Sequence, residues 1–286
     1  FHHQLITKQV IPAYQELIDG LEKLRGTGKT SRGLAYFPGG REYYQYLLRL
    51  QTGSYVPVKQ IQKRLSDQLL TDFRQIKALI QTDSSLVASL QKYSGQISLT
   101  PEQMLKELPG LMKEDFPLLK KISYEVRRVH PSMKKFLSPA FYLTSPIDDS
   151  SQNVIYINKN PIYDNQPLYN TIAHEGYPGH LYQTVWFHNH CSSDLRKILS
   201  FSGYTEGWAA YVEALSYRLD NGLDPLLGEL LEANSKATLG IHAYLDLAVN
   251  YLGWERTAVQ KYLASYFSDP ESVVDSMFET MVDNPA

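Results

Sequence analysis

The chain has 286 residues, a formal net charge of -2 and a hydrophobic fraction of 43%, enough apolar material for one large domain or two smaller ones. The nearly neutral, dispersed charge argues against nucleic acid or an anionic membrane as the main partner. Cys191 is the only cysteine, which excludes an internal disulfide and a thiolate-rich metal site.

Targeting signals are not visible in the sequence. No apolar run approaches the roughly 18 residues of a membrane-spanning helix, and no basic segment followed by an apolar one opens the chain as in a signal peptide. Because the chain begins at Phe1 and ends with "DNPA", we expect it to be a piece of a longer protein. The compartment, cytoplasmic or extracytoplasmic, is left open.

The first part of the chain has the apolar spacing of amphipathic helices. Three segments share this spacing: residues 4–26, 41–53 and 58–94. Pro12 should either kink the first helix or separate two helices. A further helix is predicted to begin with Thr100 as N-cap, Pro101 at its first position and Gln103 completing a capping box.

The periodicity then changes to that of strands. The runs "SYEVRRVHP", "AFYLTS" and "NVIYIN" predict three strands between residues 123 and 158. We expect "NVIYIN" to be an exposed edge that binds an extended peptide by β-augmentation. Helical spacing returns from Pro167 onward. The sequence therefore predicts a mainly α fold with a small inserted β-sheet (α+β), with a helical region over residues 1–122 and the sheet plus site helices over 123–286, in one continuous domain.

Residues 174–180 read "HEGYPGH", a variant of the H-E-x-x-H helix of zinc proteases. On an ideal helix His174 and His180 would point about 120° apart and could not share one ion. Pro178 and Gly179 disturb the helix, and a local bulge could absorb two extra residues and restore a common face. The alternative is a turn between two helices.

The segment "GYTEGWAAYVE" carries two glutamates, Glu206 and Glu213. Seven residues apart, they lie on nearly the same helical face. Two carboxylates on an otherwise apolar face need a partner, because an unpaired buried carboxylate is costly to keep ionised. A metal ion with its supporting residues would be such a partner.

The blocks "LYNTIAHEGYPGHLYQ" and "FSGYTEGWAAYVE" together resemble the DUF885 family, a bacterial group related to metallopeptidases. The resemblance extends to "GLAYFPGGREYYQYLLR", "PIDDSSQNVIYIN" and "YLDLAVNYLGW". It implies a gluzincin-like metallopeptidase architecture, in which a small sheet precedes the metal helix, and it makes this chain the C-terminal half of the family domain. Many members carry histidine where this chain has Asn250, and if that histidine stabilises the transition state in those members, this chain must use another donor.

The residues and the resemblance together predict one Zn²⁺ per chain, bound by His174, His180 and Glu206. Glu175 is the expected general base for hydrolysis of a peptide substrate. Periodicity alone places both glutamates of the later helix on one face, and only the resemblance prefers Glu206 as ligand and Glu213 as the residue that orients a histidine. Further oxyanion or substrate contacts are expected from the following residues: Tyr204, Tyr177, Asp246 and Asn250.

Other side chains and other functions remain as alternatives. Asp246 and Asn250, one helical turn apart, are expected to face one polar cavity, whereas His188 and His190 are expected on the surface. One alternative function is a catalytically inactive peptide-binding protein of the same fold. The other is a helical structural or interaction module, in which both motifs serve only for packing.

Overall fold

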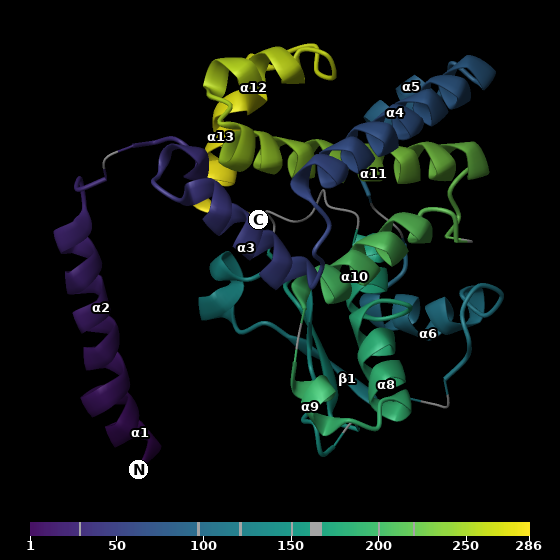
Figure 1. The fold of residues 1–286 in the computed structure, drawn as a ribbon. Coiled ribbons are helices and arrows are strands. Elements are labelled where there is room, and N and C mark those ends of the chain that lie inside the picture. The colour runs from purple at the N-terminus through teal and green to yellow at the C-terminus, as the bar shows by residue number, and fades with distance from the viewer. Residues whose placement is uncertain are drawn as a thin grey trace. The chain divides into compact units, whose positions relative to one another are not determined.

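The computed structural model describes residues 1–28, 30–95, 98–119, 122–149, 151–160, 168–199, 201–219 and 221–286. It is mainly helical with one small sheet (Figure 1), which confirms the predicted fold class. The chain forms two compact units, Phe1–Arg41 with Ala248–Pro285, and Glu42–Leu247 with Ala286. The expected division near residue 122 stays a prediction.

The first unit contains short helices from both ends of the chain. Pro12 lies in the first turn of α2, directly after the π-helical residues of η1, and the backbone keeps right-handed helical dihedrals at the junction, so one helical run passes through the proline. The elements of this unit are α1 (His2–Leu5), η1 (Ile6–Val10), α2 (Ile11–Leu24), η2 (Leu34–Tyr36), η5 (Ala248–Leu252), α12 (Arg256–Leu263) and α13 (Glu271–Asp283).

The second unit contains the sheet and the helices that carry both motifs. Its helices are α4 (Val58–Thr82), α5 (Leu86–Lys92), α6 (Pro101–Leu111), η3 (Pro131–Phe136), α7 (Leu168–Glu175), α8 (His180–His190), α9 (Asp194–Ile198), α10 (Ser202–Ser216) and α11 (Pro225–Leu247), with most of α3 (Gly40–Thr52). The long helices α4 and α11 pack against each other (Figure 1).

The predicted start of α6 is confirmed. Thr100 Oγ accepts the backbone N–H of Gln103 at 3.3 Å, and the side chain of Gln103 accepts the N–H of Thr100 at 2.8 Å. These two bonds satisfy helix-terminal donors that would otherwise lack a partner.

The three predicted strands are also confirmed, as β1 (Tyr124–Arg128), β2 (Ala140–Leu143) and β3 (Asn153–Ile157). The strand order is β1-β3-β2, with β3 parallel to β1 and antiparallel to β2. The expectation that "NVIYIN" is an exposed edge is therefore wrong. β3 is central and bonded on both sides, because proximity in sequence to the next helix does not determine strand order. β2 is an edge strand.

The main core of the second unit lies between the sheet and the site helices. Ile155 of β3, Leu105 of α6, Ile172 of α7, Leu181 of α8 and Val212 of α10 are all completely buried in one cluster. Since apolar burial is the main stabilising term, this cluster fixes the helices around the sheet. Within the described part of the chain, no helix combines the length and apolarity needed to cross a membrane.

Candidate metal centre

The motif "HEGYPGH" forms a break between two helices. α7 ends at Glu175 and α8 begins at His180, so the expected bulge inside one helix is replaced by the alternative, a turn. The N–H of Gly179 donates to the carbonyl of Ala173 at 2.9 Å, and the N–H of Tyr182 donates to that of Gly176 at 3.2 Å. Each bond spans six residues instead of the four of an α-helix. The turn thus accommodates the two extra residues of the motif.

Gly179 is required by the close approach of the two helices. A Cβ atom at this position would lie 1.7 Å from the carbonyl oxygen of His174, a distance no side chain tolerates. The turn is also tied to α10, because the indole N–H of Trp208 donates to the carbonyl of Pro178 at 2.8 Å. These contacts place His180 opposite His174, with their ring centroids 4.8 Å apart.

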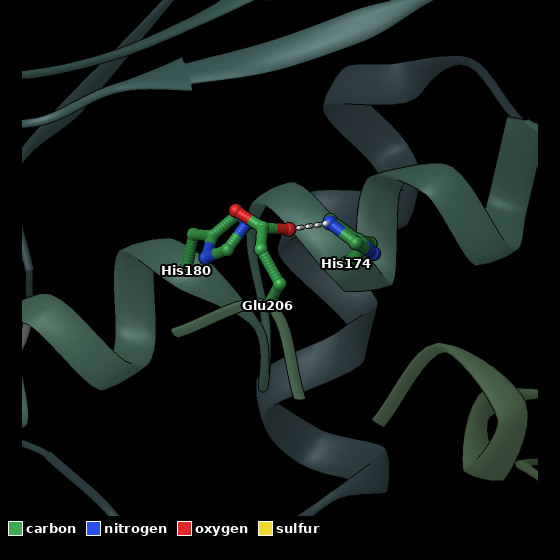
Figure 2. A group of neighbouring side chains, drawn as sticks. All are labelled: His174, His180 and Glu206. Carbon is green, nitrogen blue, oxygen red and sulfur yellow. Dashed lines mark ion pairs between the residues drawn. The ribbon is translucent and has the colours of Figure 1, made fainter. Parts of the chain in front are cut away.

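Three side chains converge at this turn: His174, His180 and Glu206. Their donor atoms lie within 4.8 Å of one another, and Oε2 of Glu206 is 3.5 Å from Nε2 of each histidine. Figure 2 shows the carboxylate between the two imidazole rings. Tetrahedral zinc with bonds of about 2.0–2.2 Å holds its donors about 3.3–3.6 Å apart. The two histidine–glutamate spacings fit such an ion.

The site is open on one side. The Glu206 side chain is 62% exposed, whereas the side chains of His174 and His180 are largely buried. Burial lowers the pKa of His180 below its ordinary value, which favours the neutral imidazole that metal binding needs. Because no fourth side chain joins this group among the described residues, a substrate or water could take the remaining position.

Glu213 contacts Nδ1 of His174, the ring nitrogen that is not directed toward Glu206. Its Oε2 is 2.8 Å from Nδ1 of His174, and since an ionised carboxylate only accepts, the histidine donates its Nδ1–H. In the neutral form of His174, the Nε2 lone pair is then directed toward Glu206. Burial alone lowers the pKa of His174, but the hydrogen bond to Glu213 and the surrounding carboxylates raise it above its ordinary value overall. One imidazole thus bridges the two glutamates that lie seven residues apart on α10.

Glu175 is held by the edge strand. Its Oε2 accepts the backbone N–H of Tyr142 in β2 at 2.7 Å, so this N–H points away from β3 toward the site. Burial raises the pKa of Glu175 above its ordinary value, although the Tyr142 N–H and His174 oppose the shift. A carboxylate with a raised pKa is a stronger base than an ordinary one, which suits it to accept a proton.

Three of the predicted substrate contacts, Tyr204, Tyr177 and Asp246, differ in their surroundings. Tyr204 is exposed on α10. Tyr177 is buried in the core and packs edge-to-face on Tyr124 with centroids 6.1 Å apart. Asp246 accepts the hydroxyl of Tyr44 at 2.5 Å and the N–H of Ala286 at 3.1 Å. The structure therefore does not place Tyr177 or Asp246 among the converging donors.

Asn250 lies in the first unit and is completely buried. Its Oδ1 accepts the N–H of Leu34 at 3.0 Å, and its Nδ2 donates to the carbonyl of Met281 at 2.8 Å. Asp246 belongs to the second unit and Asn250 to the first, so the polar cavity expected to be common to them stays a prediction.

Sequence reasoning missed two contributors to the site. The N–H of Tyr142 is a main-chain group, so no residue pattern indicates it. Trp208 belongs to the motif "GYTEGWAAYVE", but the contact of its indole with Pro178 depends on how α10 packs against the turn. The prediction that His188 is a surface residue is also wrong, since His188 is partly buried and lines a cavity.

Comparisons with known proteins place this chain in a family. The sequence over residues 2–286 matches the model described as "Bacterial protein of unknown function (DUF885)". No curated protein matches the sequence. A solved structure described as a "putative lipoprotein" of Colwellia psychrerythraea superposes with a TM-score of 0.76 at 20% identity, over 98% of this chain and 52% of that chain.

A second solved structure, described as a "putative lipoprotein of unknown function" from Shewanella oneidensis, superposes with a TM-score of 0.59 at 14% identity, over 98% of this chain and 55% of that one. At these identities the likeness shows a common fold alone. The chain spans about half the length of both relatives. Because the family model matches nearly every residue, the chain belongs to the DUF885 family.

Proposed function

We propose that this protein is a zinc-dependent hydrolase of peptide bonds, of the gluzincin type. The observation that carries the proposal is the convergence of His174, His180 and Glu206 within 4.8 Å, with Glu213 bonded to the far nitrogen of His174. A histidine that is oriented by a carboxylate on one nitrogen and aimed at other donors with the second is the usual arrangement of a metal ligand.

The donor set also suits the chemistry. Two neutral imidazoles and one carboxylate are the protein ligands of a common class of hydrolytic zinc sites. When bound, zinc acts as a Lewis acid that polarises a substrate carbonyl and acidifies a water molecule. The exposure of Glu206 leaves room for a peptide to approach the ion.

Glu175 would perform the proton transfers. It follows His174 directly, and the N–H of Tyr142 holds its carboxylate. In the proposed reaction Glu175 accepts the proton of the attacking water and then gives it to the nitrogen of the departing amine. Such general base and acid catalysis typically contributes about 10²- to 10⁴-fold to the rate.

The comparisons support the family and leave the activity as a proposal. The proposal includes the expectation that this chain corresponds to the C-terminal half of a longer family domain, since it spans 52% and 55% of two related chains. Peptide as the substrate class also belongs to the proposal, and it is supported by the edge strand β2 beside Glu175.

The test combines metal analysis with one conservative substitution. Protein purified without chelator should contain one zinc per chain by mass spectrometry and should cleave members of a peptide library. Glu175→Gln should keep the zinc and lose about 10²- to 10⁴-fold of the activity, because it removes only the proton carrier. Glu107→Gln is the matched control, since Glu107 is exposed on α6.

Each outcome has a distinct meaning. Stoichiometric zinc without hydrolysis of any peptide would favour a peptide-binding protein of the same fold. Absence of bound metal in folded protein, even after zinc is added, would contradict the proposal and favour a structural module. Full activity in Glu175→Gln would remove Glu175 from its proposed role.

A further inference from the structure

A cavity of about 520 Å³ lies in the second unit, and it is lined by residues of α8 and α10, the helices that carry His180 and Glu206 of the metal group (His174, His180 and Glu206). Its wall on α8 is formed by Gln183, Thr184, Phe187 and His188. An α-helix turns about 100° and rises about 1.5 Å per residue, so these positions lie within about 80° of the direction of His180 and about 4–12 Å farther along the axis. The cavity therefore continues the helix face that carries this histidine.

Two other segments next to site residues also line the cavity. Tyr204 and Thr205 of α10 line the cavity and directly precede Glu206. Thr144 also lines it and directly follows β2, the strand that holds Glu175. A peptide bound at the metal group would thus have a neighbouring side chain, or its own end, beside this cavity.

The charged groups of the cavity are basic. His188, Arg196 and Lys197 line it, and no carboxylate does so among the residues that the structure describes. Burial, together with the charge of Lys197, lowers the pKa of His188 below its ordinary value, which disfavours its charged form. The positive charge of the cavity comes from Arg196 and Lys197.

Neither cation is strongly neutralised within the protein. The Lys197 side chain is 16% exposed, and Asp194, at 3.1 Å, is 81% exposed. Water screens an ion pair with so exposed a partner, so Asp194 compensates the lysine only weakly. The guanidinium of Arg196 lies 5.8 Å from the centroid of the Phe187 ring, an arrangement that leaves its N–H groups able to bind an anion.

The remaining wall is apolar. Phe187, Ile198, Leu199 and Phe201 line the cavity along with the polar residues. A carboxylate on a short hydrocarbon stem fits this combination, because the stem contacts the apolar wall while the oxygens meet the cations. An extended peptide advances about 3.3–3.6 Å per residue. A peptide carboxylate bound in the cavity would therefore lie within about three residues of the scissile bond.

We propose that this basic cavity is the specificity pocket of the proposed peptidase and binds a carboxylate of the peptide through Arg196 and Lys197. The inference rests on the proposed function for its identification of the ligand as a substrate. The carboxylate can come from an acidic side chain or from the C-terminus of the peptide, and both sources present the same chemistry to the two cations.

The test measures peptide binding without hydrolysis. In the Glu175→Gln variant, fluorescence anisotropy would follow four N-terminally labelled peptides, Ala-Ala-Xaa-Ala-Ala with Glu or Gln as Xaa, each with a free or an amidated C-terminus. A carboxylate that meets the cations should strengthen binding about tenfold or more over its amide, as expected for hydrogen bonds to charged groups. A preference for Glu identifies the side chain as the source, and a preference for the free acid identifies the C-terminus.

The double variant Arg196→Gln/Lys197→Gln, made in the same Glu175→Gln background, should abolish this preference and leave the zinc content unchanged. Arg64→Gln/Lys77→Gln is the control, because it removes the same charge from exposed positions of α4 and should keep the preference. Circular dichroism and thermal unfolding would establish that both double variants are folded. If the parent protein binds acid and amide peptides equally, or if the preference survives in the Arg196/Lys197 variant, the proposal is overturned.

These results separate the pocket from the proposed chemistry. A carboxylate preference in a protein that neither binds zinc nor hydrolyses peptides supports the anion pocket and contradicts the peptidase. Zinc-dependent hydrolysis with no carboxylate preference supports the peptidase and contradicts the pocket.

Discussion

The turn between α7 and α8 and the π-helical segment η5 both interrupt helices at a polar residue, but they use that residue differently. At the turn, His174 and His180 each point Nε2 at the same oxygen of Glu206. In η5, both ends of the Asn250 amide bond to main-chain groups, and the side chain is completely buried. At the turn, donor atoms of three side chains face one another, which indicates a binding site. Main-chain groups bond to both ends of the buried Asn250 amide, which indicates structural support.

Substitutions in these two regions should change the zinc affinity to different extents. Glu206→Gln should have the largest effect, because an amide oxygen lacks the charge and donor strength of a carboxylate ligand. We expect loss of stoichiometric zinc, with affinity reduced by more than about 100-fold, beyond the usual effect of a residue that only supports a ligand. Metal analysis after gel filtration would measure it.

Glu107→Gln again serves as the control for Glu206→Gln, and a circular dichroism spectrum shows that the protein is folded. If the Glu206→Gln protein retains one zinc per chain and wild-type activity, α10 does not contribute a metal ligand. The convergence of side chains at the turn would then have another function.

Glu213→Gln should have the next largest effect. The substitution keeps an oxygen that can accept the Nδ1–H of His174 but removes the charge that makes the imidazole a better ligand. Zinc affinity, measured by competition with a chelator, should fall about 10- to 100-fold, while saturating zinc should restore measurable activity. An effect larger than that of Glu206→Gln would reverse the roles of the two glutamates.

Gly179→Ala tests whether the turn itself brings the histidines together. The new Cβ would collide with the carbonyl of His174 at 1.7 Å, so α8 has to move away from α7. Overpacking of this kind typically lowers the free energy of unfolding by about 1–3 kcal/mol, and if part of this strain is relieved at His180, zinc affinity falls about tenfold. Chemical denaturation and chelator competition would measure the two effects.

Gly110→Ala is the matched control, because a Cβ at this position of α6 meets no other atom within 4 Å. It should leave zinc affinity unchanged. Wild-type zinc affinity in a folded Gly179→Ala protein would show that the close approach of the two helices is not needed for the site.

The sequence was sufficient to predict helices and strands, but not the contacts between them. The capping box of Thr100 and the three strands followed from local patterns and are confirmed. The order of the strands was missed, because pairing depends on contacts between distant segments. The exact form of the turn was left open, since a bulge and a turn both explain Pro178 and Gly179. The main-chain partners of Asn250, at Leu34 and Met281, could not be predicted, because they lie far away in sequence.

Asn250→Ala should leave zinc affinity unchanged and affect only stability. The substitution leaves the N–H of Leu34 and the carbonyl of Met281 buried without their partner, which costs about 1–3 kcal/mol in the free energy of unfolding. Asn234→Ala, at an exposed position of α11, should change neither quantity appreciably. Urea denaturation and chelator competition on both variants would test this. A tenfold loss of zinc affinity in folded Asn250→Ala would place this residue in the function of the metal centre, and the distinction between converging donors and main-chain partners would no longer separate site from support.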